Sequence, residues 1–208
     1  MILEGCSSGG QRMDYAMLSV LPIQSTSDQT DYRQYPYVAA NILSAVLPEQ
    51  AAIWSYPITE TVSPDEVDAE RIAMNMINAF LGCMHLASRL ERLSPDQRRL
   101  IAEGVAYYHT LTPYKKEGLP IFPLGFASFT QPFAASGFRS GNRVFLAVWN
   151  LDNPSGRVTV PLDGYAVSSV KVGYPKPLPT GLEMDGTSLT VTFPARFSAR
   201  FLEIELKA

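Results

Sequence analysis

The chain has 208 residues, of which 46% are hydrophobic and 18% are charged, and its formal net charge at pH 7 is −3. This composition is typical of a globular protein, and the length allows one large domain or two small ones. The slight negative charge and the lack of a basic run argue against a nucleic-acid partner. The sequence shows no run of 18 apolar residues and no signal region, so we expect no membrane association. Its two cysteines, Cys6 and Cys83, are too few for a disulfide framework and fit a cytoplasmic protein.

The first 31 residues have the pattern of a βαβ unit. The apolar run 1–3 suits a buried parallel strand, and the glycine-rich segment 4–14 follows it. A weak amphipathic pattern then covers residues 15–21, and a second short strand at 23–25 leads into the acidic loop Asp28–Asp31. Functional sites of parallel α/β folds lie at the carboxyl ends of the strands, so we expect the chemistry of this chain here.

The middle of the chain predicts helices around one more strand. The apolar spacing indicates a helix over 32–48, a short strand over 51–57, a long helix from about 65 to 92, and another from 94 to about 112. Both long helices begin in the same way, with Ser63-Pro64 and Ser94-Pro95. In each, serine suits the N-cap, proline suits the first helical position, and acidic residues follow in the first turn.

The last third of the chain has the pattern of short strands. Residues 113–142 hold glycines and prolines among phenylalanines, and we interpret them as a linker or lead-in with an early strand near Phe126–Phe129. Beyond Arg143, turn residues separate five segments with β-branched or alternating residues: Val144–Asn150, Gly156–Pro161, Val167–Val172, Ser188–Phe193 and Ser198–Leu206. This spacing predicts a small antiparallel β-sandwich over 143–208.

Two motifs near the start resemble a known enzyme family. Residues 6–14, Cys-Ser-Ser-Gly-Gly-Gln-Arg-Met-Asp, are similar to the Cys-x-x-Gly-Gly-x-Arg-x-Asp element of glycoside hydrolase family 36, the bacterial and plant-type α-galactosidases. Residues 27–31, Ser-Asp-Gln-Thr-Asp, resemble the Ser-Asp-x-Thr-Asp element that follows it in that family. The two motifs occur in the same order with a fitting spacing, and a looser likeness extends over the rest of the chain.

The resemblance implies a (β/α)8 barrel followed by a C-terminal β-sandwich, and a retaining hydrolase that needs no cofactor and acts on terminal α-galactosyl residues of oligosaccharides. It makes Asp28 the general acid/base, and it makes Cys6, Gly9 and Arg12 contacts of the sugar. Retaining hydrolysis needs one acid to protonate the leaving oxygen and one carboxylate, roughly 5–5.5 Å away, to attack the anomeric carbon.

Three further residues are candidates for supporting roles around this site. We expect Asp14 to pair with Arg12 and fix the glycine loop. Asp31 is expected to cap the following helix, with a tuning effect on Asp28 as the alternative. Trp54 follows a predicted strand, where its ring could line a sugar pocket or pack in the core.

One departure from the family pattern sets our expectation for the whole chain. The family's nucleophile is an Asp in a Lys-Trp-Asp-type strand end upstream of the glycine element, and only five residues precede Cys6 here. We therefore expect the second half of a (β/α)8 barrel over 1–112, the lead-in over 113–142 and the sandwich over 143–208. Such a chain should be inactive alone, and its unpaired strand edges should favour a second copy or the upstream half as partner. A smaller departure is Ser25, where family members usually carry an aromatic residue.

Three other functions stay open on the sequence alone. A galactosyl transferase of the raffinose-synthase type shares this family's barrel. The segment Gly5-Cys6-Ser7-Ser8-Gly9 also fits the Gly-x-Ser-x-Gly elbow of α/β-hydrolases, in which Ser7 would be the nucleophile and His85 or His109 the base. The serine hydrolase is disfavoured because both histidines fall in helical patterns. Separately, we expect Cys83 to be a core residue on the apolar face of a helix. A non-catalytic sugar-binding module is the third alternative.

Overall fold

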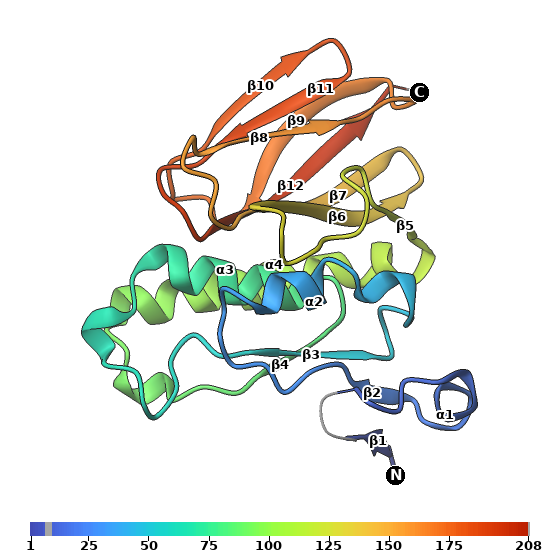
Figure 1. The fold of residues 1–208 in the computed structure, drawn as a ribbon, viewed down its shortest axis with the longest axis vertical. Helices are drawn as coiled ribbons and strands as arrows, with labels where there is room; N and C mark the ends of the chain where they lie inside the picture. The colour runs from blue at the N-terminus through green and yellow to red at the C-terminus, as the bar shows by residue number, and fades with distance from the viewer. Residues whose placement is uncertain (7–9, 208) are drawn as a thin grey trace.

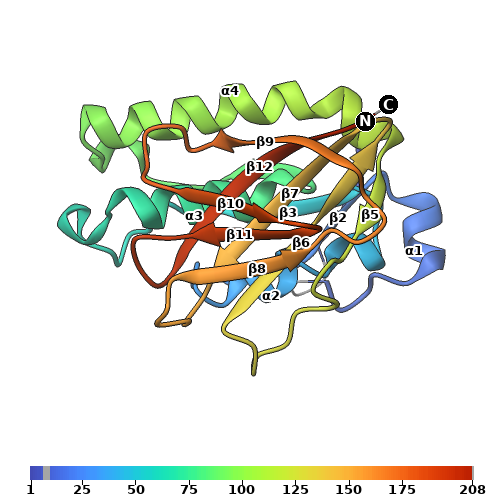
Figure 2. The ribbon, with the colours of Figure 1, turned by 90° about the horizontal axis from the view of Figure 1, so that it is seen from above.

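The computed structural model describes residues 1–6 and 10–207 and has a layered architecture (Figure 1). A parallel sheet lies at one end, a layer of helices covers one of its faces, and two antiparallel sheets stack beyond the helices. Seen from above, the strands of the antiparallel sheets lie over the helices α3 (Ala69–Phe80) and α4 (Pro95–Glu117), which run side by side (Figure 2).

The parallel sheet contains four strands within the described residues, in the same order in space as in the sequence. They are β1 (Glu4–Gly5), β2 (Ile23–Ser25), β3 (Ala51–Ser55) and β4 (Cys83–Leu86). Ala51, Ala52 and Ile53 are completely buried, as expected for a central parallel strand. The helix layer lies on one face of the sheet, and no helix of the described residues covers the other face (Figure 1).

Short helical segments lie between these strands and, after β4, ahead of α4. They are α1 (Tyr15–Val20), α2 (Tyr35–Ala39) and the 3-10 turns η1 (Ile42–Ser44), η2 (Pro64–Glu66) and η3 (Leu90–Arg92). The helix predicted over 32–48 is thus two shorter pieces, α2 and η1. None of the α1 side chains is buried in the structure.

The long helix predicted from 65 to 92 is wrong, because α3 ends at Phe80 and the chain then enters β4. The turn between them needs a glycine, since a Cβ on Gly82 would lie 2.4 Å from the carbonyl oxygen of Ala51. Cys83 and His85 therefore lie on a strand rather than on a helix, and Cys83 is only half-buried. The apolar residues after the glycine had extended the helical pattern across the turn.

Helix α4 begins as predicted and runs further than predicted. Ser94 and Gln97 form a capping box, in which each side chain accepts a hydrogen bond from the other residue's backbone N–H. The helix continues through Pro113 to Glu117. Buried Leu111 and Lys115 anchor its last turns against the rest of the molecule.

The C-terminal strands form two antiparallel sheets. The five-stranded sheet contains β5 (Leu119–Ile121), β6 (Phe133–Ser140), β7 (Arg143–Asn150), β12 (Ser198–Leu206) and β9 (Val167–Tyr174). The three-stranded sheet contains β10 (Gly181–Asp185), β11 (Ser188–Thr192) and β8 (Arg157–Pro161). Apolar residues of both sheets form one core between them, including Leu146, Leu202, Val160 and Val191. The five predicted strands correspond to β7, β8, β9, β11 and β12.

Four strands of the described residues escaped prediction, namely β4, β5, β6 and β10. Strand β6 lies inside the predicted lead-in, whereas the strand expected at Phe126–Phe129 is wrong, since those residues lie in a loop and Phe129 is 75% exposed. Small residues such as Ala134, Ala135 and Gly137 gave β6 no β-branched signal. Gly137 is required by close contact, because a Cβ there would lie 1.9 Å from the carbonyl oxygen of Phe145 on β7.

A second core joins the five-stranded sheet to the helix layer. Aromatic rings of Phe80, Tyr107, Tyr174 and Phe201 meet there with centroid separations of 5.2 to 5.8 Å. Two polar links cross the same interface. The indole N–H of Trp149 donates to Oδ1 of Asn78 at 2.8 Å, and the Arg200 guanidinium donates to both carboxylate oxygens of Glu70 at 2.8 and 2.7 Å.

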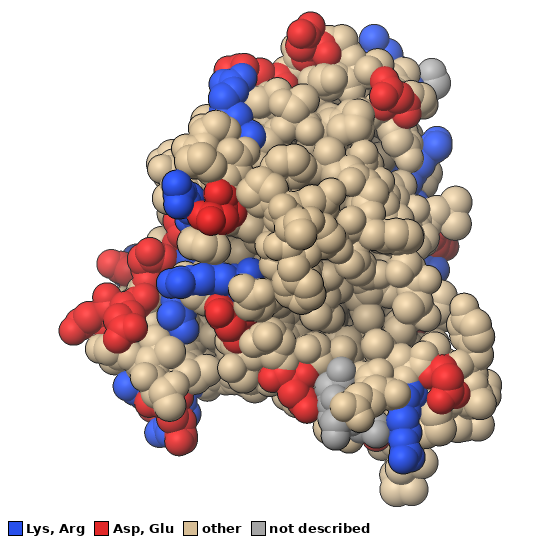
Figure 3. All heavy atoms as spheres, in the orientation of Figure 1, with Lys and Arg blue, Asp and Glu red and all other residues tan. Residues whose placement is uncertain are grey.

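Surface charge is uneven on the face shown in Figure 3. Acidic side chains gather at the end of the molecule where η2 and α3 begin. The exposed acidic residues of this segment are Asp65, Glu66 and Asp68. Acidic residues in a first helical turn interact favourably with the helix dipole. As for membrane-spanning potential, none of the described helices combines the length and the apolar character that crossing a bilayer requires.

We predict that Glu70→Ala lowers the free energy of unfolding by roughly 3–5 kcal/mol, because it leaves a buried guanidinium without its anion. The Arg200 side chain is 0% exposed and that of Glu70 is 17% exposed. Urea denaturation of the two proteins measures the difference. The double variant Glu70→Leu with Arg200→Leu should recover most of the loss. A cost below about 1 kcal/mol for the single variant would show that the pair does not hold the layers together.

We predict that Trp149→Phe costs roughly 1–3 kcal/mol, because the buried Oδ1 of Asn78 loses its donor while the aromatic packing stays. The matched control is Phe145→Leu on the same strand, which removes aromatic packing without orphaning a polar atom. Adding Asn78→Ala to Trp149→Phe should cost less than the sum of the single changes. Strict additivity in denaturation experiments would contradict the coupling.

Candidate functional site

The carboxyl ends of neighbouring parallel strands bring the predicted site residues to one edge of the sheet. Cys6 follows β1 directly, and Asp28 follows β2 by three residues. Strand β3 lies beside β2, with Gln24 opposite Ala51 and Ser25 opposite Ala52, and Tyr56 comes directly after it. Segments far apart in the sequence thus end together, as the βαβ pattern predicted.

The glycine segment contacts the start of the loop that carries Asp28. Gly10 has a φ of +91°, and a Cβ there would lie 2.7 Å from the carbonyl oxygen of Thr26. Thr26 is buried, its backbone N–H donates to the carbonyl oxygen of Ala52 at 3.2 Å, and its hydroxyl donates to the same oxygen at 2.8 Å. The first motif therefore contacts Thr26, the residue immediately before the second motif, and β3 holds Thr26 in place.

A series of local hydrogen bonds shapes the rest of the loop. Ser27 Oγ accepts from the backbone of Gln29, Gln29 Oε1 accepts from that of Asp31, and Asp31 Oδ1 accepts from that of Arg33. Asp28 is exposed, and no hydrogen bond to its carboxylate occurs within the described residues. Three side chains of the loop thus bond to its own backbone, whereas the Asp28 carboxylate is exposed.

Aromatic side chains surround this edge of the sheet. Trp54 is half-buried, and its indole N–H donates to Ser25 Oγ at 3.2 Å. The Trp54 ring stacks with Tyr56 at 6.2 Å and meets the imidazole of His85 edge-on at 4.9 Å. The Tyr35 hydroxyl accepts a hydrogen bond from the backbone N–H of Trp54 at 3.0 Å. Aromatic faces next to a free carboxylate form a surface suited to a ligand with apolar faces and hydroxyl groups.

Two tyrosines have pKa values that report on this environment. Burial raises the pKa of Tyr35, hydrogen bonding with Thr26 and with the Trp54 backbone opposes this shift, and the negative charge of Asp28 adds a smaller increase. Burial also raises the pKa of Tyr56, with smaller contributions from Tyr35, Asp28 and Cys6. Both hydroxyls therefore stay protonated at neutral pH and remain hydrogen-bond donors beside Asp28. Sequence reasoning missed Tyr56, although its spacing of two from Trp54 puts both on one face of an extended chain.

The ion pair expected for Asp14 and the helix cap expected for Asp31 are wrong, whereas the tuning of Asp28 by Asp31 stays a prediction. Asp14 is the N-cap of α1, where its carboxylate accepts from the backbone of Met17 at 3.0 Å, and the ion pairs of the described residues do not include Asp14 with Arg12. The N-cap of α2 is Gln34, so Asp31 forms a turn ahead of that helix instead of capping it. In both cases the role of the carboxylate depends on the residue at which the next helix begins. Helix α1 begins directly after Asp14, whereas α2 begins four residues after Asp31.

The remaining candidates have the following positions. Cys6 and Arg12 are exposed beside the site, whereas Gly9 and Ser7 lie outside the described residues. Of the two histidines considered as the base of a serine hydrolase, His85 lies on β4 against Trp54, and His109 is exposed on α4. Within residues 1–6 and 10–207, no group of three or more His, Cys, Asp or Glu side chains could hold a metal ion.

Comparison with known proteins identifies this architecture in solved structures. No protein-family model and no curated protein matches the sequence. The galactosidase domain of the α-galactosidase–sucrose kinase AgaSK matches with a TM-score of 0.70 and 20% identity over 99% of this chain. A variant of the family 36 α-galactosidase AgaA from Geobacillus stearothermophilus, in complex with raffinose, matches with a TM-score of 0.66 and 17% identity over 100% of this chain. The maltogenic α-amylase AmyB from Thermotoga neapolitana matches with a TM-score of 0.60 and 13% identity over 94% of this chain and 54% of its own.

This chain spans 29% of the length of the two α-galactosidase chains. At these identities the likeness concerns the fold. The chain thus has the fold of a part of family 36 α-galactosidases.

Proposed function

We propose that this chain is the C-terminal portion of a retaining α-galactosidase of the family 36 type, in which Asp28 is the general acid/base. The observation that carries the proposal is the contact of Gly10, in the first motif, with Thr26, which immediately precedes the second motif at the carboxyl edge of a parallel sheet. The loop after Thr26 carries the exposed Asp28 carboxylate, whose charge acts on Tyr56, and the Tyr56 ring stacks with Trp54. The fold is one that α-galactosidases share.

The rest of the barrel, in this proposal, comes from another part of the protein. The four parallel strands with helices on one face correspond to consecutive strands of a (β/α)8 barrel. Their helix-free face, which includes Trp54, would face the barrel interior. The nucleophilic carboxylate belongs to a strand outside these residues, consistent with the 29% coverage of the similar α-galactosidases.

The chemistry assigned to Asp28 has two steps. It first protonates the glycosidic oxygen while the nucleophile attacks the anomeric carbon, and it then removes a proton from the water that hydrolyses the galactosyl-enzyme. Cys6, Gly9 and Arg12 would shape the sugar subsite, and the Trp54 and Tyr56 rings would face the sugar. The substrates are α-galactosides such as raffinose, which AgaA binds in one of the similar structures.

We predict that the 208-residue chain alone releases no p-nitrophenol from p-nitrophenyl α-galactoside, and that a longer polypeptide from the same gene does. In that polypeptide, Asp28→Ala should lower the rate of raffinose hydrolysis roughly 10²–10⁴-fold, because the leaving oxygen loses its proton donor. Asp31→Ala is the matched control and should cost less than about tenfold.

Two results would overturn parts of this proposal. Activity of the chain alone that disappears in Asp28→Ala would mean that a carboxylate within these residues serves as the nucleophile. Equal losses in Asp28→Ala and Asp31→Ala would remove the acid/base assignment. If the longer polypeptide transfers galactose to sugars faster than to water, the activity is that of a transferase.

We predict that the isolated chain self-associates, because β1 and β4 form the edges of the parallel sheet and one face of that sheet has no helical cover. Met1, Ile2 and Leu3 are exposed next to β1 and add apolar surface. Sedimentation velocity over a hundredfold range of concentration tests this. A single monomeric species throughout that range would contradict the prediction, whereas the longer polypeptide should lack this concentration dependence.

A further inference from the structure

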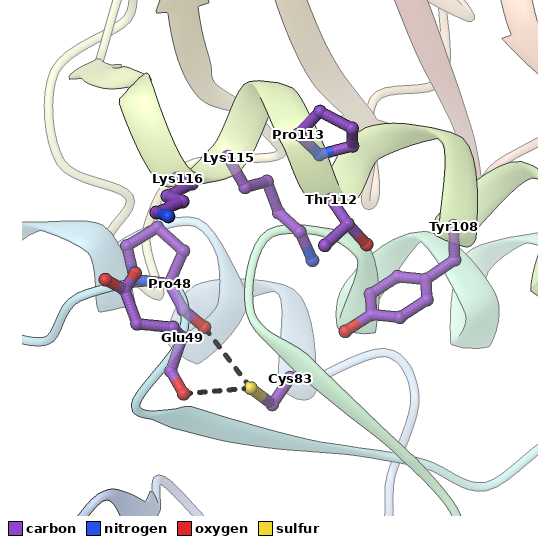
Figure 4. A pocket seen from close by; sticks show the side chains of 8 residues that line it. All are labelled: Pro48, Glu49, Cys83, Tyr108, Thr112, Pro113, Lys115 and Lys116. Atoms are coloured by element: carbon purple, nitrogen blue, oxygen red, sulfur yellow. Dashed lines mark hydrogen bonds between the residues drawn. The ribbon is translucent and has the colours of Figure 1, made fainter.

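A cavity of about 380 Å³ lies at the opposite edge of the parallel sheet from Asp28 (Figure 4). It is bounded by the last turns of α4 and by the residues that lead into β3 and start β4. The rings of Pro48, Tyr108 and Pro113 contribute to a mostly apolar wall. The cavity is therefore separate from the candidate functional site.

Lys115 is the buried charged group of this cavity. Lys115 is 8% exposed, and its amino group donates one hydrogen bond, at 2.7 Å, to the carbonyl oxygen of Gly82. The same nitrogen lies 3.9 Å from the centre of the Tyr108 ring. No carboxylate of the described residues lies within ion-pair distance of it. A buried ammonium with one hydrogen bond retains unused donors and has no anionic partner.

The other polar side chains of the cavity either form hydrogen bonds within the protein or lie at the exposed rim. The Cys83 thiol donates to the backbone carbonyl oxygens of Glu49 and Pro48, at 3.1 and 3.6 Å (Figure 4). Glu49 and Lys116 are exposed. The cavity thus combines apolar walls, one buried cation inside and charges of both signs outside.

We propose that this cavity binds a small molecule with an apolar body and a single carboxylate, and that the carboxylate pairs with the Lys115 ammonium. A cationic ligand would be repelled by Lys115 and Lys116. A neutral apolar ligand would leave the ammonium unpaired in a drier site, which is unfavourable. A phosphate would need more donors than the single buried ammonium supplies.

Lys115 also has a structural role that the test has to separate from binding. The Gly82 carbonyl comes just after the C-terminus of α3, where a cation and a donor are both favourable. The adjacent Lys116 offers a matched control, because it lines the same cavity from the same helix but is exposed.

The test is a titration of the chain with benzoate, and with benzamide as the neutral molecule of the same shape, followed by NMR or calorimetry. We expect benzoate to bind with a Kd on the order of 1 mM and benzamide at least tenfold more weakly. Lys115→Met should weaken benzoate binding at least tenfold, whereas Lys116→Met should change it less than threefold. Equal binding of the two molecules, no binding of benzoate at 20 mM, or unchanged affinity in a folded Lys115→Met variant would each overturn the proposal.

A pH series on the unmodified chain keeps the test decisive even when Lys115→Met does not fold. Burial lowers the pKa of Lys115 to about 8, while the Cys83 and Glu49 groups facing it oppose this shift. Burial raises the pKa of the Cys83 thiol and that of Tyr108. Lys115 therefore loses its charge above about pH 8, so benzoate affinity should fall between pH 7 and 9.5 while benzamide affinity stays constant. A pH-independent benzoate affinity would contradict the pairing with Lys115.

Discussion

Helix α3 has to fit two sheets at once, and much of the structure depends on how it does so. Nine of its residues are buried, yet it carries polar groups within this buried segment. On the side of the sandwich, Asn78 accepts from Trp149, and Glu70 pairs with Arg200. On the side of the parallel sheet, Asn75 Oδ1 accepts from the backbone N–H of Tyr56 at 3.2 Å. These bonds fix the rotation of the helix, because a turn about its axis would leave each polar group buried and unpaired.

This arrangement connects the C-terminal sandwich to the candidate site. Strand β3 and Tyr56 pack on α3, and α3 packs on β12 of the five-stranded sheet. Asn78 also donates, at 3.4 Å, to the carbonyl oxygen of Tyr32 in the segment after Asp28. Helix α3 therefore contacts both the sandwich and the segment that follows Asp28, and it links the two.

The sequence predicted the parts of the fold whose signals are local. Ser94-Pro95 placed the start of α4, and the alternation over 198–206 gave the bounds of β12. The βαβ pattern also predicted that the segments with Cys6 and Asp28 follow the carboxyl ends of parallel strands, and β1 and β2 do pair in parallel. What failed depends on contacts between distant segments. Gly82 ends α3 because β3 approaches it, and the small residues of β6 form a strand because β7 pairs with them. Tyr35 and His85 reach the site for the same reason, and no local pattern marks them.

The central claim is that Asp28 donates the proton to the leaving oxygen and later activates water in a double displacement. Its most direct test is azide rescue of Asp28→Ala in the longer, active polypeptide, with p-nitrophenyl α-galactoside as substrate. Azide needs no general base, so it should attack the galactosyl-enzyme, restore p-nitrophenol release and yield α-galactosyl azide, as NMR would show. The β-galactosyl azide would instead identify Asp28 as the nucleophile. An absence of rescue, with the variant folded, would contradict an acid/base role.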